Sequence, residues 1–390
     1  MISVSDALEQ LFTLVAPLDI EQVPLAGAAG RVLARDVKAV RDQPPFAASA
    51  MDGYAIGGGA AAPGARLTVI GEAAAGHGFA GAVGPGEAVR IFTGAPVPDG
   101  ATRVVIQEDV TRDGLCITLG DRLESKHNIR PAGSDFRVGD TLSAPRVLRP
   151  ADVALLAAMN AATVPVRRKP EVALIATGDE LVMPGGDPGP DQIIASNSFG
   201  LKALLEEAGA QARLLPIARD NAASLTTAFD LAKGADLIVT IGGASVGDHD
   251  LVGQVAGDLG MQRAFYKVAM RPGKPLMAGR MGDAAMVGLP GNPVSAMVCG
   301  HVFVVPMITA MLGLGATPAP RRTARLAAQL VANGPREHYM RARLTPDGLV
   351  AETRQDSALL GVLAQADALL VRGADDPARA EGDMVEYLPI

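Results

Sequence analysis

Residues 171–181 read EVALIATGDEL, a short apolar run that ends at Gly178 and is followed by two acids. A run of this length, closed by a glycine turn, is typical of a buried β-strand. Residues 196–209, SNSFGLKALLEEAG, carry a helical pattern, with Asn197 or Ser198 as the predicted cap and Gly209 at the end. The two segments together predict the first strand and helix of an α/β domain.

The same alternation continues along the chain. Strands are predicted at 212–218 and 235–243, and helices at 221–234 and 248–260. Alternation at this spacing predicts a doubly wound parallel sheet that is covered by helices on both faces. From Arg321 onward, short strand-like runs and one helix near Leu359 predict a small, mostly β domain.

The region before this domain has two different patterns. Residues Ser5 to Ala16 place apolar side chains at helical spacing, with Ser3 or Ser5 as the cap, and a second helix is predicted from Pro150 to Ala161. Between them, apolar runs alternate with Gly/Pro turns, as expected of a β module. The β module therefore looks inserted between two helical pieces that can pack as one unit.

The predicted fold class is multi-domain α/β plus β. Its predicted domains are an N-terminal helical and linker domain (1–43 and 138–168), an inserted mostly β domain (44–137), a central α/β domain (169–318) and a C-terminal β domain (319–390).

Composition excludes several functions. The net charge is −7, no basic run exceeds three residues, and aromatic residues make up only 3% of the chain, so nucleic acid and anionic lipid are poor partners. Two distant cysteines, Cys116 and Cys299, form neither a disulfide framework nor a zinc site. Residues 284–320 carry no Asp, Glu, Lys or Arg, but prolines and Gly300 interrupt them, which favours a buried core helix. With no export signal at the N-terminus, the sequence predicts a cytoplasmic protein.

Acidic residues follow three different predicted strands: Glu180, Asp220 and Asp250. Ligands bind at the carboxyl ends of the strands in open α/β sheets, so these acids are expected to meet at one rim. A single acid there is often only a helix cap or a loop charge. Three clustered carboxylates repel one another and favour a hard cation such as Mg²⁺.

A glycine-rich loop and a basic segment lie near the same rim. Residues 242–247 read GGASVG, which fits either an anion site, with main-chain N–H groups facing a phosphate, or a plain tight turn. Residues 267–274 read KVAMRPGK and hold two of only seven lysines, so Lys267, Arg271 and Lys274 are candidates to bind an oxyanion or form an ordinary basic turn. These patterns indicate a Mg²⁺-dependent enzyme acting on small phosphate-bearing molecules.

Seven stretches, taken in order, resemble the molybdopterin molybdenumtransferase family, to which the C-terminal domain of gephyrin also belongs. They are PPFAASAMDGYA (44–55), FTGAPVPDGA (92–101), ATGDEL (176–181), SNS (196–198), IGGASVGDHD (241–250), KVAMRPGKP (267–275) and GLPGNPVSA (288–296). The resemblance implies that the 169–318 domain is molybdopterin-binding-like. It implies insertion of molybdate into adenylylated molybdopterin with release of AMP, in molybdenum cofactor biosynthesis.

The resemblance also implies residue roles, a cofactor and partners. It implies catalytic roles for four acids, Asp52, Glu180, Asp220 and Asp250, of which the last three hold Mg²⁺. The implied substrate-binding residues are Thr93, Asp135, Gly178, Asn197, Gly242, Gly243, Ser245, Lys267, Arg271, Lys274, Pro290, Asn292, Pro293, Arg341 and Ser357. A homodimer whose site draws on both protomers is implied, as is contact with the adenylyltransferase that supplies the substrate.

The chain departs from the family pattern at three places. Ala47 and Ala48 replace an Asp and an Asn, Arg271 replaces a Lys, and Asp356 stands beside Ser357 where Gly is usual. An extra carboxylate next to a dianion site is unfavourable unless it points away. The departures leave room for another oxyanion, such as tungstate, and two alternative functions stay open: a nucleotidyl transferase that adenylylates molybdopterin, and a non-catalytic scaffold like gephyrin's domain.

Overall fold

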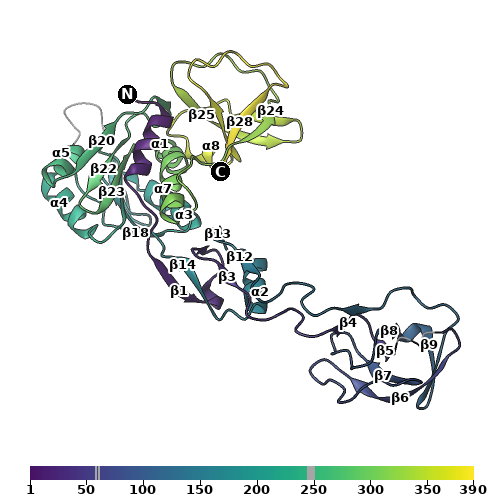
Figure 1. Ribbon diagram of the computed structural model, residues 1–390. Helices are drawn as coiled ribbons and strands as arrows, with labels where there is room; N and C mark the ends of the chain where they lie inside the picture. The colour runs from purple at the N-terminus through teal and green to yellow at the C-terminus, as the bar shows by residue number, and fades with distance from the viewer. Residues whose placement is uncertain (58, 60–61, 244–250) are drawn as a thin grey trace. The chain divides into compact units, whose positions relative to one another are not determined.

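The computed structural model describes residues 1–57, 59, 62–243 and 251–390 (Figure 1). The described chain forms two compact units. The first contains residues 1–21, 30–34 and 166–390, and the second contains residues 22–29 and 35–165. The chain leaves the first unit within strand β1 (Ile20–Pro24) and returns to it for residues 30–34, which include β2 (Val32–Leu33). It then forms the rest of the second unit and returns to the first within β14 (Thr163–Arg167).

A six-stranded sheet forms the centre of the first unit, in the order β18-β15-β19-β23-β22-β20. The strands are β15 (Glu171–Ala176), β18 (Gln211–Leu214), β19 (Leu237–Ile241), β20 (Gln262–Tyr266), β22 (Met277–Met281) and β23 (Ala284–Leu289). The predicted parallel pairing is confirmed for β18, β15, β19 and β23. Strand β22 is antiparallel to both of its neighbours, β23 and β20. The short connection from Met281 to Ala284 leaves no room for the crossover helix that a parallel pairing of β22 with β23 would need.

Helices cover both faces of this sheet, as predicted (Figure 1). Val172 and Leu174 point to the face covered by α1, α3, α6 and α7, while Ala173 and Ile175 point to the face covered by α4 and α5. The helices are α1 (Val4–Thr13), α3 (Asn197–Glu207), α4 (Ala222–Leu231), α5 (Leu251–Asp258), α6 (Pro293–Cys299) and α7 (Val305–Met311). Alternation along one strand thus builds two cores.

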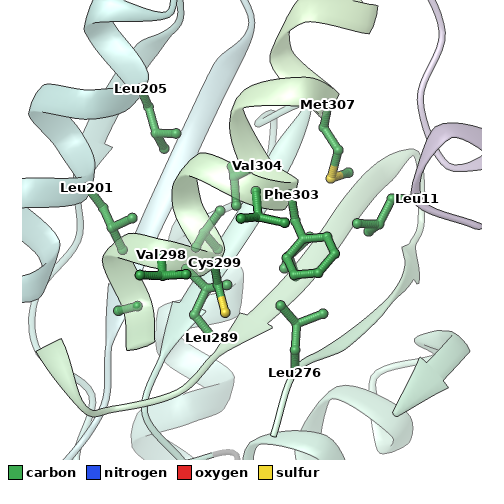
Figure 2. Packing of buried hydrophobic residues seen from close by; sticks show 14 of the residues in the cluster. Leu11, Leu201, Leu205, Leu276, Leu289, Val298, Cys299, Phe303, Val304 and Met307 are labelled. Atoms are coloured by element: carbon green, nitrogen blue, oxygen red, sulfur yellow. The ribbon is translucent and has the colours of Figure 1, made fainter. Parts of the chain in front are cut away.

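The larger core contains the uncharged segment that the sequence singled out (Figure 2). Phe303 and Met307 pack with Leu11 of α1 and Leu276 in one buried cluster. Helix Pro293–Met311, which includes a π-helical turn at Gly300–Val304, is long and apolar enough to cross a membrane, but 78% of its most apolar window is buried inside the structure. The prediction of a buried core helix is confirmed.

The N-termini of α1 and α3 test the helix caps that the sequence predicts. Ser3 caps α1, since its hydroxyl accepts the Asp6 N–H and the Asp6 carboxylate accepts the Ser3 N–H. The predicted cap of α3 is wrong: the N-cap is Ser196, and its side chain makes no capping bond to a helix N–H. Asn197 instead donates from Nδ2 to the carbonyl of Gly291 at 2.6 Å, so this amide ties α3 to another loop.

A second sheet completes the first unit, in the order β21-β25-β27-β28-β24, with β26 beside β25. Its elements are β21 (Met270–Arg271), β24 (Arg322–Arg325), β25 (Glu337–Thr345), β26 (Gly348–Ala351), β27 (Ala368–Arg372), β28 (Met384–Pro389) and helix α8 (Leu360–Leu363). Sequence reasoning missed β21, which pairs parallel to β25 and carries the basic segment into this sheet. Tyr339 and Leu369 join the larger core, so both sheets share it.

The second unit contains a six-stranded sheet in the order β8-β5-β7-β6-β10-β9. Its elements are β3 (Val37–Lys38), β4 (Ala48–Ser49), β5 (Gly53–Ile56), β6 (Arg66–Ala73), β7 (Glu87–Ile91), β8 (Arg103–Ile106), β9 (Val110–Asp113), β10 (Cys116–Leu119), β11 (Ile129–Arg130), β12 (Thr141–Leu142), β13 (Arg146–Val147) and α2 (Pro150–Ala158). Helices α1 and α2, which the sequence suggested could pack together, belong to different units. The four-domain division stays a prediction.

Candidate functional site

A cavity of about 930 Å³, here called the acid pocket, opens where β15, β19 and β23 end. Small strands β16 (Leu181–Val182) and β17 (Ile193–Ile194) form part of its wall. Nine residues predicted from the sequence line it: Gly178, Glu180, Asn197, Asp220, Gly242, Gly243, Pro290, Asn292 and Pro293. The expected convergence of strand ends therefore occurs.

Glycines at this rim are required by backbone geometry. Gly178, Gly242 and Gly243 all have positive φ angles, of 146°, 94° and 64°. A Cβ atom on Gly242 would lie 2.8 Å from the Thr177 carbonyl oxygen, and one on Gly178 would lie 2.3 Å from a Glu180 carboxylate oxygen. Glycine is the residue that permits both the backbone conformation and the close approach.

The Gly242 N–H is not available to a phosphate, because it donates to the Leu289 carbonyl at 3.0 Å. The role of Gly242 is therefore to bring strands and loop together, rather than to donate to an anion. Ser245 and Asp250, along with the rest of the 244–250 loop, lie outside the described residues. Their predicted contributions stay predictions.

Two carboxylates, Glu180 and Asp220, come from loops after different strands and face the same cavity. The loops touch: the Asp220 N–H donates to an Asp179 carboxylate oxygen at 3.4 Å, and Arg219 donates to the Asp179 carbonyl at 2.9 Å. Within the described ranges no group of three His, Cys, Asp or Glu could hold a metal ion. Two carboxylates and substrate oxygens nevertheless fit Mg²⁺, which commonly takes one or two carboxylates and phosphate oxygens.

A smaller cavity of about 340 Å³, here called the basic pocket, adjoins the acid pocket, since Pro275 and Asn292 line both. Its walls bring the predicted Arg271, Lys274 and Ser357 together. The basic segment thus contributes to a pocket wall, which goes beyond an ordinary basic turn.

Arg341 lies behind this pocket and is 0% exposed. One guanidinium nitrogen donates to the Asp356 carbonyl at 2.9 Å and more weakly to the Arg354 carbonyl, while Nε and the other terminal nitrogen have no partner in the part of the chain that is described. Burial lowers the pKa of Arg341 below its ordinary value. The Asp356 charge offsets only part of this burial, so an anion brought into the site would stabilise the guanidinium further.

Asn292 separates the two pockets and is held by the C-terminal domain. Its Nδ2 donates to the Ser357 hydroxyl at 3.0 Å, and the Val294 N–H donates to the Ser357 carbonyl at 3.0 Å. The residue is the N-cap of α6, yet its side chain makes no capping bond there. Ser357 therefore fixes the loop between the pockets.

Asp356, which departs from the family pattern, uses its carboxylate in a hydrogen bond within its own turn. One of its carboxylate oxygens accepts the Ala358 N–H at 2.8 Å, which closes a tight turn after Ser357. This bond ties one oxygen of the extra carboxylate to the turn, although the residue still lines the basic pocket.

Lys267 belongs to the same basic segment but lines neither of the two pockets. Its φ is +70°, and its ammonium group lies 4.8 Å from the centre of the Tyr266 ring. The structure thus places Lys267 in a cation–π contact, and its substrate-binding role stays a prediction.

The second unit holds the other predicted residues, Asp52, Thr93 and Asp135. One Asp52 carboxylate oxygen accepts the Thr93 N–H at 2.7 Å and the Thr93 hydroxyl at 2.8 Å. These two bonds, helped by the Arg90 charge, lower the pKa of Asp52 below its ordinary value. The backbone and the hydroxyl of Thr93 thus hold the Asp52 carboxylate in its ionised form.

Gly53 explains why glycine follows Asp52. A Cβ atom there would lie 1.9 Å from the Val105 carbonyl oxygen, so β5 can pair closely with β8 only through a glycine. Asp135 is exposed, and its N–H donates to the Gln43 carbonyl at 2.9 Å. No bond described for Asp135 joins it to Asp52.

Sequence reasoning missed several residues at these sites. Arg336 and Gln355 line the basic pocket, and Ser196 lines the acid pocket. Gln355 bonds both the N–H and the carbonyl of Arg341, which pins the edge of β25. Ser196 lies in the SNS stretch (196–198) that the sequence had singled out, whereas nothing in the local sequence marks Arg336 and Gln355, because their position depends on pairing between distant segments.

Comparison with known proteins covers the chain from end to end. Residues 2–160 match the family model of the MoeA N-terminal region (domain I and II), residues 173–310 that of a probable molybdopterin binding domain, and residues 323–390 that of the MoeA C-terminal region (domain IV).

Curated relatives and solved structures agree with these matches. The molybdopterin molybdenumtransferase of Haemophilus influenzae is 39% identical over 79% of this chain and 76% of its own length, and that of Nostoc sp. is 36% identical over 100% and 94%. A molybdopterin biosynthesis MoeA protein from Pyrococcus horikoshii superposes with a TM-score of 0.85 at 30% identity, covering 100% of this chain and 99% of that one. The chain therefore belongs to the molybdopterin molybdenumtransferase (MoeA) family.

Proposed function

We propose that the chain is a molybdopterin molybdenumtransferase that inserts molybdate into adenylylated molybdopterin and releases AMP. Family membership supports the proposed reaction, and the two adjoining pockets support placing that reaction where the strands of the central sheet end. The observation that carries the proposal is the pairing of an acid pocket with a basic pocket across a single shared wall at Pro275 and Asn292.

The acid pocket suits the phosphoanhydride end of the substrate. Glu180 and Asp220, with Asp250 from outside the described residues, would hold Mg²⁺ there. When bound, the cation would screen the charge of the anhydride oxygens. The chain's own contribution is a rim of close-packed glycines, Gly178, Gly242 and Gly243, which lets the substrate approach the backbone.

The basic pocket suits molybdate, a tetrahedral dianion. Arg271 and Lys274 line it, and the buried Arg341 lies behind it with two nitrogens that lack partners in the described chain. Arginine can donate two parallel N–H groups to an oxyanion, while lysine supplies a point charge. Ser357 and Asn292 would orient the oxyanion toward the acid pocket.

Further parts of the proposal rest on the family resemblance. Asp52 and Thr93 would supply a catalytic carboxylate and its orienting partner, and Asp135 a further substrate contact. A homodimer, contact with the adenylyltransferase that makes the substrate, and a cytoplasmic location complete the proposal.

The test is release of AMP from adenylylated molybdopterin, with molybdate and Mg²⁺ varied separately. We expect the wild-type chain to need both. The variants Asp220→Asn and Glu180→Gln should keep the fold and lose about 100-fold or more of the rate, because each removes a charge at the reacting phosphate.

Asp230→Asn is the matched control, since Asp230 is an exposed α4 acid whose ion pair among the described residues is with Lys233 at 2.8 Å. It should turn over like the wild type. Wild-type rates in Asp220→Asn and Glu180→Gln would overturn the acid-pocket assignment. Wild-type AMP release that ignores molybdate would overturn the molybdenum transfer itself.

A further inference from the structure

His338 is a second buried group with an unexplained polar atom near the basic pocket. The residue lies in β25, is 7% exposed, and its Nε2 is buried with no hydrogen-bond partner in the described chain. A buried ring nitrogen without a partner is costly and calls for a physical explanation.

Arginines flank His338 on both sides of its strand. In the parallel pairing of β21 with β25, Arg271 is opposite His338, and in the antiparallel pairing of β25 with β27, Arg372 is opposite it. Side chains at paired positions project from the same face of a sheet, so the three side chains form a row. Arg271 at one end of this row is also a wall of the basic pocket.

The other charged groups around His338 are mixed in sign but mostly positive. Arg336 and Arg341 are on its own chain segment, and both act on it electrostatically, as do Arg271 and Arg372. The negative charges are already engaged: Asp376 bonds Arg372 and Arg379, Glu337 bonds Arg321, and Asp356 closes its own turn. While the basic pocket is empty, the charges that act on the His338 ring are those of four arginines, of which Arg372 is ion-paired with Asp376.

We propose that His338 is a charge-regulating residue of the basic pocket: it is neutral while the pocket is empty and gains a proton when an oxyanion binds beside Arg271. The proposal rests on the oxyanion-binding part of the proposed function, and it adds a proton to that binding step. A dianion offsets the field of the arginines, so the protonated imidazole becomes more favourable.

The direction of the pH effect follows from linkage. Burial first, and then the arginines, lower the pKa of His338 to about 4. If oxyanion binding raises that pKa, protonation must raise oxyanion affinity by the same factor. Affinity for a dianion should therefore increase as pH falls toward the pKa of the occupied state.

His301 provides a matched control inside the same unit. It lies in the π-helical turn, and its pKa is also lowered to about 4, but burial is the cause. It lines a different cavity, with Met297, Leu360 and Leu363 among its neighbours. An oxyanion in the basic pocket should leave the titration of His301 unchanged.

The experiment is NMR titration of the full-length chain with isotope-labelled histidine, with and without sulfate. Sulfate is the probe because it stays a dianion across the acidic range in which a His338 pKa of about 4 has to be measured. His338→Gln and His301→Gln assign the two signals. We expect sulfate to raise the pKa of His338 by about one unit, equivalent to about 10-fold in affinity, and to leave His301 unmoved.

Calorimetry in two buffers with different ionisation enthalpies measures the same proton independently. Wild type and His301→Gln should take up protons on binding sulfate below about pH 6, and His338→Gln should not. A His338 signal that sulfate does not move, or equal proton uptake in His338→Gln, would overturn the proposal. If sulfate shifts the His338 pKa but the chain releases no AMP, the proposed reaction is wrong and this inference stands. If the chain releases AMP as expected but sulfate does not shift the His338 pKa, this inference is wrong and the proposed reaction stands.

Discussion

The acid and basic pockets share one wall and are built in opposite ways. The acid pocket uses carboxylates at strand ends and glycines whose backbone geometry leaves no room for a side chain. The basic pocket uses residues from four distant segments, and behind it lies a fully buried arginine with two nitrogens that have no partner among the described residues. The difference teaches that one pocket is shaped by local backbone conformation, whereas the other depends on tertiary packing of charge.

The largest expected effect separates a functional buried arginine from a structural one. Arg341→Met should lower affinity for sulfate or molybdate about 100-fold, yet change the free energy of unfolding by only about 1 kcal/mol, since it removes a buried cation two of whose nitrogens lack partners in the described chain. Equilibrium unfolding and calorimetric titration measure the two quantities.

Arg372→Met is the matched comparison, because Arg372 is 2% exposed but bonds Asp376 and the Pro377 carbonyl. It should lower the free energy of unfolding by about 3 kcal/mol. If Arg341→Met destabilised the chain as strongly as Arg372→Met, Arg341 would be a structural residue and the contrast between the pockets would fail.

The next effect tests whether backbone geometry shapes the acid pocket. Gly242→Ala should lower the free energy of unfolding by about 1–3 kcal/mol, because alanine at φ +94° is strained and its Cβ would meet the Thr177 carbonyl oxygen at 2.8 Å. Oxyanion affinity of the basic pocket should be unchanged. Gly257→Ala in α5, where a Cβ meets nothing within 4 Å, should be neutral or stabilising. Equal stability of the two variants would contradict the geometric reading.

The smallest effect concerns a carboxylate held by hydrogen bonds. Thr93→Val removes the hydroxyl bond to Asp52 but keeps the N–H bond, so the pKa of Asp52 should rise part of the way toward its ordinary value. Carbon-detected NMR of the Asp52 carboxyl measures it. Thr111→Val, on an exposed position of β9, should leave that pKa unchanged.

The same variant predicts the sign of a pH effect on stability. A folded-state pKa below the unfolded value contributes stability above the unfolded pKa, which is lost as pH falls through the folded pKa. The stability difference between wild type and Thr93→Val should therefore exist at neutral pH and vanish in acid. A difference that grows in acid would show that the threonine acts on another group.

Much of the fold could be predicted because its signals are local. The alternation of strands and helices in 171–260 depends on periodicity and turn residues, and the structure has those elements within a few residues. The antiparallel strands β20 and β22 and the short β21 were missed, since an apolar run does not state its partner or direction. Asn197 was misread as a cap because a side-chain amide can bond its own helix or a distant loop equally well.

The sequence alone determined the acids at strand ends, the glycine bends between strand and helix, and the family, because these depend on neighbours within a few residues. Tertiary structure alone decided that Asn292 separates two pockets, that two nitrogens of the buried Arg341 lack partners in the described chain, and that His338 lies between Arg271 and Arg372. The physical reason is that burial and net charge at a point are sums over segments far apart in the chain, which only the packing of β21, β25 and β27 brings together.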